Sequence, residues 1–346
     1  MDPRSADQLL DNPAGALELL AEAGGATFPH LMEARAYTAA ELEKRTDALA
    51  GLDVGDRLAV VLFGSWGRDE LTEQSDDDWA VLVDGPVEAE DAAVDAVLEG
   101  TSQVLGGAER EPGAQQQFGV AFSTGELVGN IGLDADTNAN LTRRMLLLLE
   151  SRGVVGRDAH RRGVERVLHA YLGYGVREHR PPRFLLNDLV RYWRTMCVDF
   201  EGKRRGARGD DTKYASRNAK LRTSRKVLFA SGLLPVLLCH MKESREMPAF
   251  LGRQLACPPT DRLAAAFIQQ DAVPEGVRAL GAYDRWIGLS QLPEVRAELA
   301  TLGEFNRDES ELFAQIREIG DELQRGLLAL LYETGLSPLT RQYGLF

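Results

Sequence analysis

Residues 64–83 read GSWGRDELTEQSDDDWAVLV and place three consecutive aspartates, Asp76 to Asp78, directly before a short apolar run. Neighbouring carboxylates repel one another, and burying them beside a strand costs solvation energy. A cation bound between them would offset both costs. The stretch therefore raises the expectation of a metal site at the start of a buried strand.

Apolar runs flank the aspartates on both sides. Residues 57–64, RLAVVLFG, predict a buried strand, and Trp79–Val83 predicts a second one that ends at Asp84-Gly85-Pro86. Gly64 and Ser65 open the turn after the first strand. A glycine lets backbone N–H groups approach an anion closely, and a serine hydroxyl can donate to a phosphate oxygen.

Asp76 and Asp78 are two residues apart, so in an extended chain both side chains point to the same side. Two carboxylates opposite a phosphate-holding turn suit Mg²⁺-dependent phosphoryl transfer, because Mg²⁺ takes oxygen ligands and bridges to substrate phosphates. Asp77 then points to the opposite side with Trp79, and we expect it at an exposed strand start. A register with Asp77 as the ligand is disfavoured because its i+2 neighbour is Trp79.

The pattern Gly64-Ser65, ten residues, Asp76-x-Asp78 resembles the signature of the DNA polymerase β-like nucleotidyltransferase superfamily. The local sequence is also similar to the bacterial branch that includes the PII uridylyltransferases, in which an arginine after the turn and a serine before the first aspartate are usual. These are Arg68 and Ser75 here. The strong match covers about twenty residues, and a looser one, LTRRMLLLLESRGVVGRD, reaches residue 158.

The resemblance implies that Gly64 and Ser65 hold the triphosphate of a nucleoside triphosphate, and that Asp76 and Asp78 ligate Mg²⁺ or Mn²⁺. It also implies a third carboxylate on a neighbouring strand, often the catalytic base. The candidates are Glu126, which opens the run LVGNIGL, and Asp134 or Asp136 after it. Glu126 is placed slightly ahead, because a strand antiparallel to its predecessor starts near the hairpin turn.

The remaining pattern predicts an α+β protein: a small mixed β-sheet nucleotidyltransferase domain followed by an all-helical domain. We expect N-terminal helices over 1–50, the catalytic domain over 51–158 and a helical domain over 159–346 that forms the other wall of the cleft. Within these, helices are expected at 13–23, 38–50 (from a capping box at Thr38), 87–99 and 141–152, and further strands at 118–122 and 127–133. An apolar stripe over 312–330 is expected in a helix-bundle core.

Charge is unevenly distributed. Residues 177–226 hold 15 Lys and Arg against six Asp and Glu, although the whole chain carries −13. One interpretation is a solvated helix face paired with acidic neighbours; the other is an anion site. On the second, Lys220 and then Arg217 are the first candidates to neutralise the triphosphate, from a helical stripe with Lys213 and Ser224.

The net charge of −13 argues against a chain that binds nucleic acid or membrane over its whole surface. Three sparse cysteines, no signal-peptide pattern and no long apolar run favour a cytoplasmic protein without disulfides. The five histidines show no metal-ligand spacing, and no GK[ST] phosphate loop occurs.

Three functions remain open. The first is an enzyme that transfers a nucleoside monophosphate to a hydroxyl of a protein, a small molecule or an RNA end. The second is a non-catalytic nucleotide sensor, favoured if the third carboxylate is missing. The third is a toxin- or defence-type nucleotidyltransferase that makes a nucleotide messenger or modifies tRNA, an idea weakened by the overall acidity.

Overall fold

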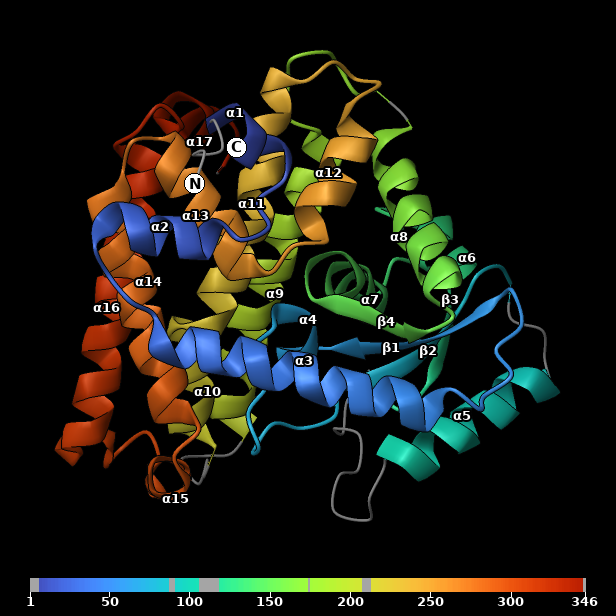
Figure 1. Cartoon of the computed structure of the whole chain (residues 1–346), viewed down its shortest axis with the longest axis horizontal. Helices are drawn as coiled ribbons and strands as arrows, with labels where there is room; N and C mark the ends of the chain where they lie inside the picture. The colour runs from blue at the N-terminus through green and yellow to red at the C-terminus, as the bar shows by residue number, and fades with distance from the viewer. Residues whose placement is uncertain (1–5, 87–90, 106–117, 174, 207–212, 345–346) are drawn as a thin grey trace. The chain divides into compact units, whose positions relative to one another are not determined.

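The computed structural model describes the chain except for residues 1–5, 87–90, 106–117, 174, 207–212 and 345–346 (Figure 1). It is a mixed α+β structure with one small four-stranded sheet and many helices. The chain divides into two compact units: a sheet unit of residues 34–176 and 247–252, and a helical unit of residues 1–33, 177–246 and 253–346. Neither unit is one continuous segment.

The sheet consists of β1 (Leu58–Phe63), β2 (Trp79–Val83), β3 (Ala121–Ser123) and β4 (Ser151–Val155), in the order β3-β2-β1-β4. β1 pairs antiparallel with β2 and β4, while β2 pairs parallel with β3. β1 and β2 are buried along their whole length, which is why both are continuous apolar runs rather than alternating patterns. The predictions of these two central strands are confirmed.

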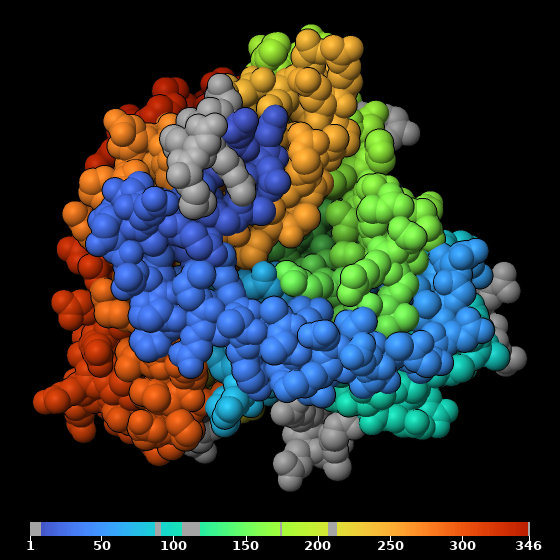
Figure 2. Space-filling model, viewed as in Figure 1, coloured from blue at the N-terminus to red at the C-terminus, as the bar shows by residue number. Residues whose placement is uncertain are grey.

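One face of the sheet packs against two helices, α3 (Pro29–Leu49) and α5 (Ala92–Leu105), which Figure 1 shows in blue and teal beside the strands. In the space-filling view α3 lies on the face of the molecule turned to the viewer (Figure 2). The core on this side is a single apolar cluster that contains Leu42, Leu49, Leu58, Val60, Leu62, Trp66, Trp79, Val81, Val83, Val94, Val97 and Leu105.

The other face is covered by α8 (Arg157–Leu172), which contacts β1, β2 and β4, with α6 (Thr124–Gly129) and α7 (Asn138–Leu149) beside it. α8 approaches closely because Gly163 has no side chain: a Cβ there would lie 2.6 Å from Leu82 Cδ2. These helices pack on the face of the sheet that carries Phe63 and Leu82.

A fully buried arginine ties the helices of this face together. Arg144 donates two hydrogen bonds of 2.8 Å to Asp136, one of 2.8 Å to the Tyr171 hydroxyl and one of 3.1 Å to the Leu127 carbonyl. A buried charge is tolerated when its donors are satisfied in this way. Asp136 is therefore a structural partner of Arg144.

Several sequence predictions in the sheet unit are wrong. The expected strand 127–133 is the helix α6 followed by turns, because Ser123 caps a helix by accepting from Glu126 N at 3.2 Å. The expected helix 141–152 ends at Leu149, and β4 begins two residues later. The helix expected at 87–99 runs over Ala92–Leu105, and residues 87–90 lie outside the described part.

Thr38 does not cap a helix. It lies inside α3, where its hydroxyl donates to Ala34 O at 2.7 Å and accepts from Leu71 N at 2.9 Å. Helix α3 begins earlier, at Pro29, with Asp284 accepting from Leu31 N at 2.8 Å. A long-range carboxylate thus replaces the local capping signal that the sequence suggested.

The helical unit contains α1 (Ala6–Asp11), α2 (Ala16–Gly24), α9 (Arg183–Gly206), α10 (Tyr214–Arg222), α11 (Ser224–Leu238), α13 (Pro259–Gln269), α14 (Val273–Ser290), α15 (Pro293–Thr301), α16 (Glu311–Tyr332) and α17 (Ser337–Tyr343), with two short 3-10 turns, Cys239–Met241 and Arg307–Glu309. Helix α12 (Met247–Leu255) has its first six residues in the sheet unit. Asp261 of α13 caps α2 from a distance, because its carboxylate accepts from Gly15 N at 3.2 Å and Leu17 N at 3.0 Å.

The apolar stripe of α16 lies in the core of this unit, as the sequence predicts. Ile316, Leu323 and Leu330 are completely buried, and α16 packs along α14. The close approach depends on Gly326, where a Cβ would lie 2.6 Å from Ala279 Cβ.

Cys197, Cys239 and Cys257 are free thiols. Within the described part of the chain, every helix is too short or too polar to cross a membrane.

Candidate functional site

The Gly-Ser turn joins β1 to the four-residue helix α4 (Ser65–Arg68). Gly64 has φ +67° and ψ −128°, a backbone conformation that residues with a Cβ rarely adopt. The β1–β2 ladder extends beyond both strands, since Phe63 N donates to Asp78 O at 2.8 Å. The hairpin therefore returns the third aspartate of the run to the turn.

The side chain of Asp78 lies against Gly64. A Cβ on Gly64 would stand 3.0 Å from Asp78 Oδ2. The glycine thus provides both the turn conformation and the space for the carboxylate. The structure brings together Gly64, Ser65 and Asp78, which the sequence grouped by spacing alone.

Asp77 points to the opposite side from its neighbours, as the alternation of an extended chain requires. Its Oδ1 accepts from Trp66 Nε1 at 3.2 Å, and its Oδ2 lies 3.6 Å from Arg45 Nη2. The Asp77 side chain is only 4% exposed. The expectation of an exposed Asp77 is wrong, because an indole donor and a guanidinium of α3 satisfy the carboxylate within the core.

Asp76 is exposed to solvent one position before Asp77. Ser75, expected near the nucleotide, instead organises the preceding turn: its Oγ accepts from Thr72 N at 3.0 Å. The aspartate run therefore combines a buried anchor at Asp77 with an exposed Asp76 and a half-buried Asp78.

Arg68 is held by two buried carboxylates. Its Nε donates to Glu70 Oε2 at 2.8 Å and its Nη1 donates to Glu150 Oε2. The Glu150 side chain has no exposed surface, and that of Glu70 has 2%. The superfamily resemblance implies that Arg68 binds the nucleotide. In the structure its guanidinium forms ion pairs with these two buried glutamates.

Gly67 makes the Arg68–Glu150 contact possible. A Cβ on Gly67 would lie 2.0 Å from Glu150 O, so only a glycine lets α4 approach the α7–β4 junction this closely. Sequence reasoning missed Glu70 and Glu150. Glu150 follows a leucine run with no motif around it, so its contact with Arg68 could not be read from local pattern.

The junction also carries a part-buried serine–histidine pair. Ser151 Oγ donates to Leu147 O at 2.6 Å, so the 2.8 Å contact with His160 Nε2 has the imidazole as donor. Burial, and then the charge of Arg152, lower the pKa of His160 to about 4. His160 is therefore neutral at pH 7.

The three candidates for a third carboxylate lie elsewhere. Glu126 is on α6 beyond Ser123, which pairs with Val83, so it is one β2 length, on the order of 15 Å, from Asp78. Asp134 is exposed in the turns after α6, and Asp136 is paired with Arg144. The premise that Glu126 opens a strand is wrong, because that segment is helical.

Phe118 occupies the position beside Asp78. The segment that leads into β3 runs along β2, with Gly119 N donating to Trp79 O at 2.7 Å, and Phe118 precedes it by one residue. Its half-buried ring lies 5.9 Å from the ring of Phe63, and that of Phe122 lies 6.3 Å from Phe63. The Arg143 guanidinium lies 5.7 Å from the centre of the Phe122 ring. Sequence reasoning named neither Phe118 nor Arg143 as a site residue.

Asp76 and Asp78 suit a divalent cation whose other ligands come from substrate phosphates. Mg²⁺ is commonly held by one or two carboxylates, with substrate phosphates completing its shell. Asp78 lies beside the Gly64 turn, and Asp76, two residues earlier in the chain, would supply the second carboxylate. The described residues contain no group of three or more His, Cys, Asp or Glu side chains placed to hold a metal on their own. The donor set therefore suits a cation that arrives with a polyphosphate, and not a closed protein cage.

The basic candidates belong to the helical unit. Lys220 is exposed on α10 and Arg217 is half-buried one turn earlier. Ser224 does not share their stripe, because the helix breaks at Thr223 and Ser224 Oγ accepts from Trp286 Nε1 at 3.1 Å. Other cations of the segment are paired with acids, including Arg204 with Glu201 and Glu304. A site shared by Lys220 and Asp76 stays a prediction.

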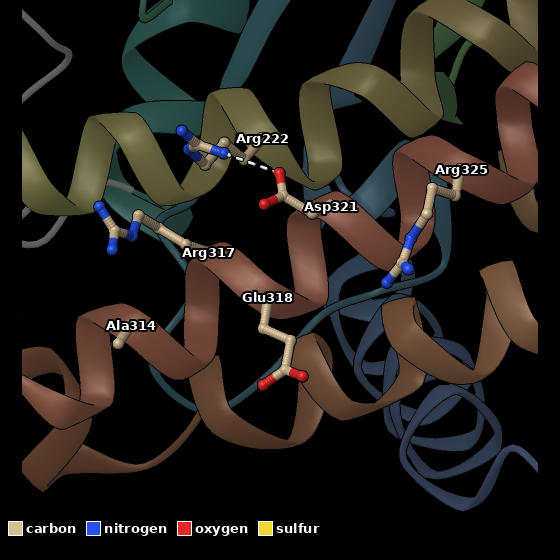
Figure 3. Close-up of a pocket in the computed structure, with 6 residues that line it drawn as sticks. All are labelled: Arg222, Ala314, Arg317, Glu318, Asp321 and Arg325. Carbon is tan, nitrogen blue, oxygen red and sulfur yellow. Dashed lines mark hydrogen bonds and ion pairs between the residues drawn. The ribbon is translucent and has the colours of Figure 1, made fainter.

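An open cavity of about 600 Å³ lies between α10 and α16, lined by Arg222, Ala314, Arg317, Glu318, Asp321 and Arg325 (Figure 3). Arg222 Nη1 donates to Asp321 Oδ1 at 3.1 Å across it. The lining carries three arginines and two acids, and neither Lys220 nor Arg217, the cations that the sequence analysis named, is part of it.

No family model matches the chain, and neither a curated protein nor a solved structure does.

Proposed function

We propose that this protein is a divalent-cation-dependent nucleotidyltransferase. The observation that supports it is the contact between Gly64 and Asp78, which sets a phosphate-binding type of turn against a carboxylate. Phosphates on the turn would be repelled by the Asp78 carboxylate unless a cation lay between them. The arrangement therefore suits a ligand that carries phosphates and a divalent cation together.

In the proposed reaction, an acceptor hydroxyl oxygen attacks the α-phosphorus of a nucleoside triphosphate and its proton passes to water, while the bond from the α-phosphorus to the bridging oxygen breaks and pyrophosphate leaves. The Gly64–Ser65 turn binds the β- and γ-phosphates, and Asp76 and Asp78 hold Mg²⁺ or Mn²⁺. The cation would supply charge neutralisation on the triphosphate. Asp77, held by Trp66 and Arg45, would position its neighbours Asp76 and Asp78.

The test is direct. The full chain is incubated with each labelled nucleoside triphosphate and Mg²⁺ or Mn²⁺, with and without cell lysate as a source of acceptor, and pyrophosphate release is followed. We expect turnover that Asp78→Asn and Asp76→Asn abolish. Asp134→Asn, which changes an exposed acid of the same unit, is the matched control and should keep full turnover. Undiminished turnover in both Asp76 and Asp78 variants would reject the proposal.

A non-catalytic nucleotide sensor is the second candidate. Phe118 beside Asp78 favours it. On the segment that leads into the neighbouring strand, at the position where the superfamily resemblance implies a catalytic carboxylate, this chain has a phenylalanine, which cannot take a proton from an acceptor hydroxyl. On this alternative, triphosphate binds in a cation-dependent manner but no pyrophosphate forms with any acceptor. Multiple turnover in the assay above would exclude it.

A further inference from the structure

The sheet face around Asp78 carries an aromatic cluster that the proposed reaction does not use. Phe118, Phe63 and Phe122 project from neighbouring strands or their extensions on the face that also bears Asp78. Phe63 and Phe122 are each 2% exposed and belong to the core. Phe118 is only half-buried, so it is the member of the three that retains exposed surface.

The cluster is continuous with the Gly64 turn. Across the sheet Phe118 lies beside Asp78, and Asp78 faces Phe63, the residue before Gly64, so two strand spacings, about 10 Å, separate the backbone of Phe118 from the start of the turn. That span is within the length of a nucleoside triphosphate. A ligand whose terminal phosphates lie on the turn and whose α-phosphate lies near Asp78 would bring its base toward Phe118.

We propose that Phe118 is the stacking platform for the nucleobase of the bound triphosphate. Bases stack on aromatic side chains through their π-faces, which needs no hydrogen-bond readout and tolerates any base. Arg143 lies against Phe122, the buried member of the same cluster, 5.7 Å from the centre of its ring. The inference rests on the proposed function, because it needs the triphosphate to bind at Gly64.

The experiment compares two probes by calorimetry in Mg²⁺. Each of the four ribonucleoside triphosphates contains a base, whereas inorganic triphosphate presents the phosphates alone. Phe118→Leu keeps the apolar packing on Phe63 but removes the ring, and Phe118→Tyr keeps a ring. Leu133→Ala, at a 63% exposed apolar residue of the same unit, is the control.

We expect Phe118→Leu to weaken nucleoside triphosphate binding by about 5- to 100-fold, the range of one base–aromatic stack, and to leave inorganic triphosphate binding within twofold. Phe118→Tyr and Leu133→Ala should bind like the parent chain. Equal loss for both probes, or no loss for the nucleotide, overturns the stacking role while leaving the nucleotidyltransferase proposal standing. If the parent chain binds neither probe, the proposed function fails and the stacking role fails with it.

Discussion

Trp66 Nε1 donates to Asp77 Oδ1 across 3.2 Å, which fastens the helix after the Gly-Ser turn to the middle of the aspartate run. Arg45 of α3 approaches the other oxygen of the same carboxylate at 3.6 Å. Three segments of the sheet unit meet at this one buried side chain. Asp77, in the middle of the aspartate run, is therefore a structural anchor that joins these segments.

Asp77→Ala removes an acceptor from a buried indole N–H and a charge partner from Arg45. We expect it to lower the free energy of unfolding by about 1–3 kcal/mol in urea titration. Asp77→Asn keeps an acceptor for Trp66 and should cost less. Asp76→Ala, one residue away and exposed, should leave stability unchanged or raise it because like charge is removed. An Asp76 variant as unstable as the Asp77 variant would contradict this division of roles.

Arg68→Ala leaves Glu70 and Glu150 buried without their guanidinium. Loss of one partner from a buried ion pair costs about 3–5 kcal/mol, so we expect a loss of that size in chemical denaturation. The control is Arg161→Ala, whose exposed ion pairs with Asp158 and Glu165 should not affect the transition measurably. Similar midpoints for the two variants would show that the Arg68 cluster does not stabilise the fold.

Gly67→Ala tests the close contact of α4 with the α7–β4 junction. The new methyl would lie 2.0 Å from Glu150 O, and main-chain atoms cannot move aside as a flexible side chain can. We expect a loss of stability of about 3 kcal/mol or more, read as a lower urea midpoint. Gly129→Ala, where a Cβ meets nothing within 4 Å, is the comparison and should fold like the parent chain. A Gly67 variant of normal stability would disprove the contact.

His160 makes the stability of the sheet unit depend on pH. Its pKa is lowered to about 4 from 6.5, so the unfolded chain binds the proton first as the pH falls. The stabilising effect is complete above pH 6.5 and is lost between pH 6.5 and pH 4, by about 2–3 kcal/mol. His160→Gln should remove this part of the decline in denaturation curves measured from pH 7 to pH 4. An identical pH profile in the variant would contradict the assignment.

Lys220→Ala tests whether the basic segment contributes to the nucleotide site. If it does, triphosphate binding should weaken by about 1.5–3 kcal/mol, the size of a charge-assisted hydrogen bond. Arg205→Ala removes another exposed cation of the same segment and controls for general electrostatics. Unchanged affinity in Lys220→Ala, or the same small loss in both variants, would favour a solvated helix face.

The local sequence pattern is sufficient to predict a strand where every residue of the strand is buried. β1 and β2 are buried at every position, so a short apolar run that ends at a turn signal, Gly64 for β1 and Asp84-Gly85-Pro86 for β2, identifies both. β4 has one buried residue among Ser, Arg and Gly, and it directly follows a helix, so it carried no strand signal. α6 was mistaken for a strand because its cap, Ser123, lay inside the stretch expected to form a turn between strands.

For the site, the sequence predicts that Gly64 and Asp78 lie close together, because both belong to one motif and a single hairpin, β1–β2, sets the spacing between them. It could not reveal the partners that come from far along the chain. Glu150 is 82 residues from Arg68, and Arg45 reaches Asp77 from a helix on the other side of β1 in the sequence. Such contacts depend on topology, which periodicity and turn chemistry do not encode.

The capping of α2 by Asp261 has a consequence during protein synthesis. The carboxylate that accepts from Leu17 N lies 244 residues later in the chain. At about 5–20 residues per second, a ribosome needs roughly 10–50 s to cover that distance. During this interval Leu17 and Leu20, which end up with no exposed surface, have not yet met the helices α13 and α14 that bury them. The apolar face of α2 therefore stays without these packing partners until α13 and α14 have been synthesised.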